Sequence, residues 1–78
     1  MISIQQIQYI LSLSEEKQFQ KASELCFVTQ PTLSMQVKKA EQILGGQLFD
    51  RSRSPLEMTK FGNELLPIFR DIIADYSN

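Results

Sequence analysis

The stretch TQPTLSMQVKKAE, residues 29–41, predicts the amphipathic helix around which the rest of the fold is organised. Thr29 suits an N-cap, and Pro31 is tolerated in a first turn because its missing N–H would have had no partner inside the helix. The expected inward stripe repeats at 3.6 residues: Leu33, Val37, Ala40 and Leu44. Gly45 and Gly46 then end the helix. The outward side starts with small uncharged polar residues, which predicts a surface that contacts a partner.

A second, shorter helix is expected just before it, over residues 19–26. Its inward side would hold Phe19, Ala22, Ser23 and Cys26, and the two small residues in the middle allow another helix to approach closely. Residues 27–29 are the whole connection to the helix at 29–44. Two helices joined by about three residues match a helix-turn-helix.

Residues 3–15 predict a first helix capped by Ser3. One apolar stripe holds Ile4, Ile7 and Leu11, and a second set on nearly the opposite face holds Ile2, Tyr9 and Leu13. A helix that is apolar on two faces has to be covered twice. We expect one cover from the chain itself and the other from a second subunit.

After the glycines, short strands are expected at residues 48–49 and 56–58, around the tip sequence RSRSP. This is a hairpin, or wing, with Arg51 and Arg53 at its tip, and it must lean on the helices because a two-stranded hairpin is marginal alone. The fold class is therefore mostly α: a winged helix-turn-helix with a three-helix core and a two-stranded wing over residues 1–58. A linker helix over residues 59–78 follows.

Thr59 is expected to cap this last helix, which continues to about Asp75 with a kink at Pro67. Its apolar residues spread over roughly 160° when 100° is allowed per residue. That arc is wide enough for a mixed role in the core and in a homodimer, although a purely internal role is the alternative. The expected dimer contacts are Leu65, Ile68, Phe69, Ile72, Ile73 and Tyr76.

Composition excludes several classes of function. The 78 residues contain one Cys and no His, and they show no phosphate-binding loop, so neither an enzyme, a metal site nor a cofactor is expected. Cys26 is interpreted as a small buried hydrophobe and not as a redox sensor. No apolar run has the length of a membrane span, which predicts a cytoplasmic protein without membrane contact.

The charge is unevenly distributed along the chain. Residues 17–60 hold seven Lys and Arg against four Asp and Glu, a surplus of +3, while the flanks hold one base and five acids, so that the total is −1. A basic middle supports nucleic-acid binding only weakly by itself.

An ordered set of motifs resembles the N-terminal DNA-binding domain of LysR-type transcriptional regulators. The matching elements are Phe19, Ala22-Ser23, VTQPTLS at residues 28–34, Ala40-Glu41, Gly45, LFDR at residues 48–51, and Met58-Thr59 with Gly62. The stretch CFVTQPTLSMQ, residues 26–36, is most similar to the peroxide-responsive branch. The resemblance implies a bacterial transcription factor that binds double-stranded DNA as a homodimer, cut within or just after its linker helix, with the effector domain absent.

The resemblance places the helix at 29–44 in the major groove and the wing, residues 50–56, on the backbone or minor groove. Side-chain chemistry then suggests roles for individual residues. The expected DNA-binding residues are Gln30, Pro31, Thr32, Ser34, Met35, Lys38, Arg51 and Arg53.

Three positions depart from the family pattern: Met35 replaces a frequent Arg, Ser54 replaces a frequent basic residue in the wing, and Ala40 replaces a larger core residue. Simpler interpretations stay open. The polar residues at the helix start could serve capping and solubility, Lys38 and Lys39 could be a solvated face, and Arg51 could pair with a nearby acid. The domain could also be a winged-helix protein–protein interaction module.

Overall fold

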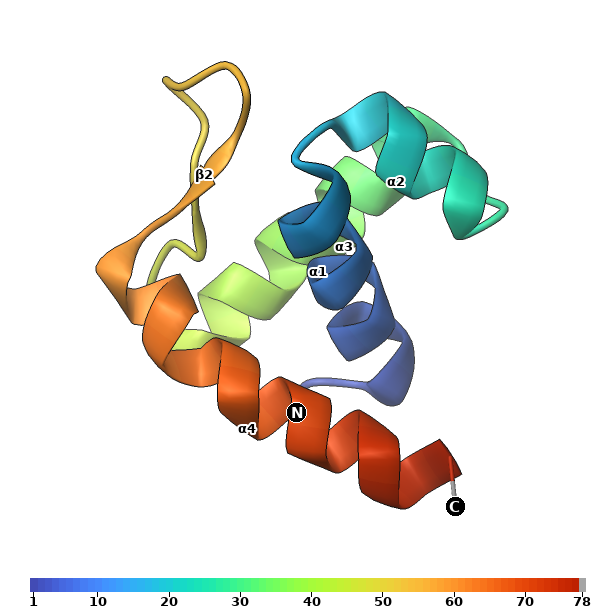
Figure 1. Ribbon diagram of the computed structural model, residues 1–78, viewed down its shortest axis with the longest axis vertical. Helices are drawn as coiled ribbons and strands as arrows, with labels where there is room; N and C mark the ends of the chain where they lie inside the picture. Colours follow the sequence, from blue (N-terminus) through green and yellow to red (C-terminus); the bar gives the residue numbers. More distant parts are fainter. Residues whose placement is uncertain (78) are drawn as a thin grey trace.

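The computed structural model describes residues 1–77 and contains four helices and one two-stranded sheet (Figure 1). Their bounds in chain order are α1 Ile4–Glu16, α2 Phe19–Leu25, α3 Gln30–Leu44, β1 Phe49–Asp50, β2 Glu57–Met58 and α4 Lys60–Ser77. All four predicted helices and the hairpin are confirmed, and the helix bounds differ from the expected ones by one or two residues.

Local chemistry explains where the helices begin and end. The Ser3 hydroxyl accepts the amide of Gln6, and the Gln6 side chain accepts the amide of Ser3, which makes a reciprocal cap at the start of α1. Thr29 caps α3 through its hydroxyl. Gly45 ends α3 with a φ of 83°, a left-handed conformation that suits glycine.

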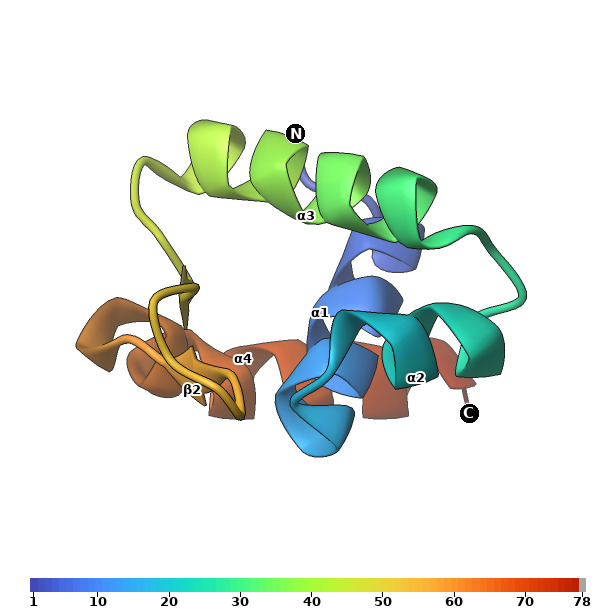
Figure 2. The ribbon, with the colours of Figure 1, turned by 90° about the horizontal axis from the view of Figure 1, so that it is seen from above.

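Helix α1 lies in the middle of the fold and contacts α2, α3 and α4. Figure 2 shows it between α3 on one side and α4 on the other. The core that forms around it consists of Ile7, Tyr9, Ile10, Leu13, Ala22, Leu33, Val37, Ala40, Leu48, Phe49, Leu56 and Phe69. Cys26 is half-buried at the edge of this core, as is Phe19.

The expectation that one face of α1 needs a second subunit is wrong. Tyr9 and Leu13 are both buried in the core of the same chain. The reason is that α4 folds back across α1 and covers the face that α3 leaves free (Figure 2).

The wing, which consists of β1, β2 and residues 51–56 between them, is antiparallel, with Phe49 opposite Met58 and Asp50 opposite Glu57. It leans on the helices, as predicted. The amide of Leu56 donates to the carbonyl oxygen of Lys17 at 3.1 Å, at the turn between α1 and α2. Two side chains, Leu48 just before β1 and Leu56 just before β2, are buried in the core.

Helix α4 begins after Thr59, whose hydroxyl accepts the amide of Gly62, and it continues through Pro67. The expected role of Phe69 in a dimer needs correction, because this side chain is only 3% exposed and belongs to the core of its own chain. Leu65 and Ile73 are half-buried beside that core. The large hydrophobic side chains that α4 leaves exposed are Ile68, Ile72 and Tyr76, at intervals of one helical turn.

Candidate nucleic-acid interface

The outer face of α3 gathers most of the predicted site residues. Pro31, Met35 and Lys38 are exposed and Ser34 is half-buried, since the inward stripe at Leu33, Val37 and Ala40 holds the opposite side of the helix in the core. A shallow hollow of about 530 Å³ runs along this face, lined by Pro31, Ser34, Met35, Lys38, Lys39 and Gln42. The face therefore offers an apolar strip at Pro31 and Met35, followed along the helix by the ammonium groups of two lysines.

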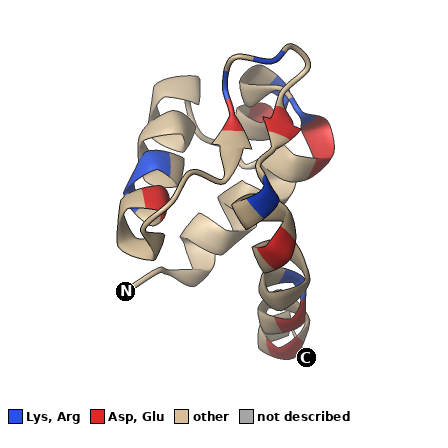
Figure 3. Ribbon diagram, turned by 90° about the vertical axis from the view of Figure 1, so that its left-hand side faces the viewer, with Lys and Arg blue, Asp and Glu red and all other residues tan. Residues whose placement is uncertain are grey.

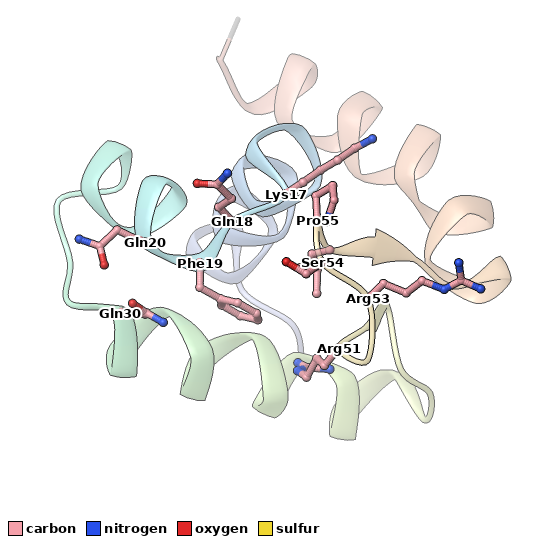
Figure 4. A pocket seen from close by; sticks show the side chains of 10 residues that line it. Lys17, Gln18, Phe19, Gln20, Gln30, Arg51, Arg53, Ser54 and Pro55 are labelled. Carbon is pink, nitrogen blue, oxygen red and sulfur yellow. The ribbon is translucent and has the colours of Figure 1, made fainter.

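A second hollow, of about 500 Å³, lies between α2, the start of α3 and the wing (Figure 4). Gln30, Arg51 and Arg53 line it, so the fold brings these predicted residues from two distant segments to one place. Gln18 and Gln20 line the same hollow and were not predicted. Their polar character at the start of α2 was visible in the sequence, but their proximity to the wing depends on the tertiary fold.

Thr32 is turned toward the cap of its own helix. Its hydroxyl accepts a hydrogen bond from the Thr29 hydroxyl at 2.8 Å, and its amide donates to the same Thr29 oxygen at 3.3 Å. The capping interpretation of the helix start thus holds for Thr32. Gln30 and Ser34 take no part in this cap.

Arg51 pairs with an acid, which is the alternative that the sequence left open. Its Nη2 lies 2.7 Å from Glu41 Oε1 and its Nη1 lies 3.2 Å from Glu41 Oε2. The second carboxylate oxygen also accepts the amide of Leu48 at 2.6 Å. Glu41 is 8% exposed and Arg51 27%. The base of the wing is therefore fixed to α3 by a two-pronged ion pair, and Arg51 is held inward and not at the tip.

Arg53 is the exposed base of the wing, with 64% of its side chain accessible. Figure 4 shows it directed away from α3, whereas Arg51 lies alongside that helix. Its guanidinium is near two carboxylates, with Nε 3.6 Å from Asp50 Oδ2 and Nη1 3.5 Å from Glu57 Oε2.

Asp50 is also held by the wing loop. Hydrogen bonds from the Ser52 hydroxyl and the Ser52 amide lower the pKa of the Asp50 carboxyl, and the positive charge of Arg53 lowers it further. Asp50 is therefore ionised at neutral pH.

Figure 3, in which the ribbon is coloured by residue type, shows basic residues on α3 and in the loop of the wing. Within residues 1–77 no group of His, Cys, Asp and Glu is arranged to hold a metal ion. Among the same residues no helix has both the length and the apolar character needed to cross a membrane.

Residues 4–63 match the family of bacterial regulatory helix-turn-helix proteins of the lysR type. The chain belongs to the LysR family. Two LysR-family relatives are the transcriptional regulator EstR of Acinetobacter baylyi, 37% identical over 73 residues, and the dual regulator OxyR of Escherichia coli, 32% identical over 74 residues. These matches cover 94% and 95% of this chain and 24% of each relative. The chain thus spans about a quarter of the length of these curated relatives.

The arrangement of the LysR-family elements is also shared with solved structures. A structure of Vibrio fischeri DarR in complex with DNA superimposes with a TM-score of 0.96 at 28% identity, covering 99% of this chain and 26% of that one. The winged helix-turn-helix class is thereby confirmed. A hydrogen peroxide-inducible genes activator of Escherichia coli is also among the relatives, but EstR is more similar in sequence. The resemblance to the peroxide-responsive branch therefore does not distinguish that branch from the others for this chain.

Proposed function

We propose that this chain binds double-stranded DNA in a sequence-specific way, as the DNA-binding domain of a LysR-type transcriptional regulator. The observation that carries the proposal is the outer face of α3, which the rest of the chain leaves uncovered along an apolar and basic strip. An α-helix of this kind fits the width of the major groove. Membership of a family of regulatory helix-turn-helix proteins supports the same function.

The proposed roles follow from side-chain chemistry. Gln30 pairs with adenine through its amide, while Pro31 and Met35 pack on thymine methyl groups, which favours A·T-rich contacts. Ser34 reaches a base or a phosphate. Lys38 contributes phosphate attraction from the same face. Thr32 contributes to the same helix start mainly through its cap.

Arg53 is the proposed backbone or minor-groove contact of the wing, since its guanidinium is exposed. Arg51 contributes by fixing the wing to α3 through Glu41, and a direct phosphate contact by Arg51 is not needed. We further propose the division into a DNA-binding unit over residues 1–58 and a linker helix over residues 59–78, of which Asn78 lies outside the described residues.

The proposed active form is a homodimer joined through α4. Its row of Ile68, Ile72 and Tyr76 is largely apolar and exposed. Two copies of α3 would then enter successive major grooves about one helical turn apart. A cytoplasmic location, where DNA is accessible in bacteria, and a role in binding and not in catalysis complete the proposal.

Selection from a pool of random duplexes, followed by titration of a fluorescent selected duplex at several salt concentrations, tests the function. Affinity should fall steeply with salt, and the selected duplex should bind much more tightly than a random one. Gln30→Ala should cost roughly 1–3 kcal/mol, mostly at one base pair, and Arg53→Ala should weaken all duplexes alike while reducing the salt slope by about one. Gln8→Ala, an exposed glutamine on α1, is the matched control.

A winged-helix protein–protein interaction module is the second candidate. It would bind selected and random duplexes equally, with no loss of sequence preference on Gln30→Ala. Equal binding of the selected and random duplexes by the unmodified chain would remove the proposed DNA-binding function, whereas an unchanged sequence preference in Gln30→Ala would remove only the base-reading role of Gln30.

A further inference from the structure

Residues 50–57 of the wing carry as many acids as bases. Asp50, Arg51, Arg53 and Glu57 are the charged residues of the segment 50–57, so their charges cancel. The Arg51 charge is already neutralised by the nearly buried Glu41. Arg53 is therefore the one base of this segment that is left for a phosphate, and it stands beside two carboxylates.

The two carboxylates face each other across the sheet. Asp50 and Glu57 are direct partners in the antiparallel ladder, an arrangement that is unfavourable for two like charges. The guanidinium of Arg53 lies 3.6 Å from Asp50 and 3.5 Å from Glu57, so its positive charge offsets their mutual repulsion. Both distances are longer than the usual 2.7–2.9 Å of a charge-assisted hydrogen bond, and all three side chains are exposed. The guanidinium is attracted to the pair without being tightly bonded to either acid.

We propose that Asp50 and Glu57 compete with DNA phosphate for Arg53 and thereby limit the sequence-independent affinity of the wing. The proposal rests on the proposed function, in which Arg53 contacts the backbone. A phosphate that approaches Arg53 has to replace the two carboxylates as the counter-charge of the guanidinium. The two carboxylates also repel the phosphate directly. Because phosphate contacts carry no base information, the two acids lower binding to every duplex by a similar factor and leave base reading to α3.

Glu57→Gln is the sharpest test, because the ion pair with Arg53 is the one polar contact that the Glu57 carboxylate makes within residues 1–77. Asp50 also accepts two hydrogen bonds from Ser52, so Asp50→Asn serves as a second variant. Asp75→Asn is the matched control, since it removes the same charge in the last turn of α4, at the end of that helix that points away from the wing (Figure 1).

The assay titrates a selected and a random duplex with each variant in low salt and across a salt series. Glu57→Gln should tighten binding to both duplexes roughly 2- to 5-fold, with their ratio unchanged and the salt slope steeper. At about 0.15 M salt, where the Debye length is about 8 Å, Asp75→Asn should have less than about a 1.5-fold effect, because charges beyond a Debye length are screened. In an Arg53→Ala background the gain from Glu57→Gln should be clearly smaller, because only the direct repulsion between Glu57 and phosphate is then removed.

Three results would overturn the proposal: a gain no larger than that of Asp75→Asn, a gain that persists undiminished without Arg53, or a gain confined to one of the two duplexes. None of these touches the proposed function if the unmodified chain still prefers the selected duplex. Loss of that preference would instead end the proposed function itself. A circular-dichroism spectrum and thermal midpoint for each variant show that the changes arise in the folded protein.

Discussion

Replacing Glu41 by Ala tests whether the wing is fixed to α3 by this single side chain. The carboxylate accepts hydrogen bonds from both Nη atoms of Arg51 and from the backbone amides of Leu48 and Phe49. Its removal leaves the buried amide of Leu48, which makes the shorter of the two bonds, without an acceptor, and this costs about 1–3 kcal/mol. It also leaves the Arg51 charge without its partner. Breaking a buried ion pair costs about 3–5 kcal/mol in total. Arg51 is 27% exposed and is partly rehydrated, so we expect about 3 kcal/mol.

That loss is large for a chain of 78 residues, whose whole free energy of unfolding should be about 4–12 kcal/mol at 0.05–0.15 kcal/mol per residue. Urea unfolding followed by circular dichroism measures it, with the slope m checked for constancy. Gln42→Ala, at the exposed neighbouring position, should change stability by less than about 0.5 kcal/mol. A loss below about 1 kcal/mol for Glu41→Ala would mean that the wing is held mainly by its apolar side chains, and the reasoning would be refuted.

Other substitutions test the packing around the site. Gly62→Ala should destabilise by about 1–3 kcal/mol in spite of its better helix propensity, because the added Cβ would overlap the backbone carbonyl oxygen of Leu48; an unchanged urea midpoint would contradict the close approach. Thr29→Ala should cost about 1 kcal/mol through loss of the cap, visible as a lower thermal midpoint. Ile72→Glu should give monomers in sedimentation with a normal spectrum, whereas Phe69→Ala should unfold the domain more easily, by about 3–5 kcal/mol. Unfolding by Ile72→Glu together with monomers from Phe69→Ala would mean that Ile72 is the core residue and Phe69 the dimer contact.

The sequence predicted the parts of the fold that depend on short-range chemistry. Thr29 as a cap and Gly45 as a stop are properties of a few neighbouring residues, and both are found in the structure. The inward stripe of α3 also follows from periodicity alone, and Leu33 and Val37 are completely buried.

Features that depend on long-range packing were not predictable in the same way. The 100° rule gave the apolar arc of α4 but could not tell that Phe69 is buried in the core while Ile72 stays exposed. The pairing of Arg51 with Glu41 links residues ten positions apart in the chain, and several acids were equally plausible partners. Gln18 and Gln20 join the candidate site only because α2 and the wing approach each other.

Burial of Phe69 has a consequence for the spacing of target half-sites. Phe69 packs α4 into the same core that holds α3. The direction of α4, the proposed dimer helix, is therefore fixed relative to that of α3, the proposed DNA-reading helix, within each protomer. Two protomers joined along α4 would hold their reading helices at one separation and one angle. Inserting or deleting a base pair between the half-sites should then be absorbed by twisting or bending of the duplex, at an elastic cost borne by the nucleic acid.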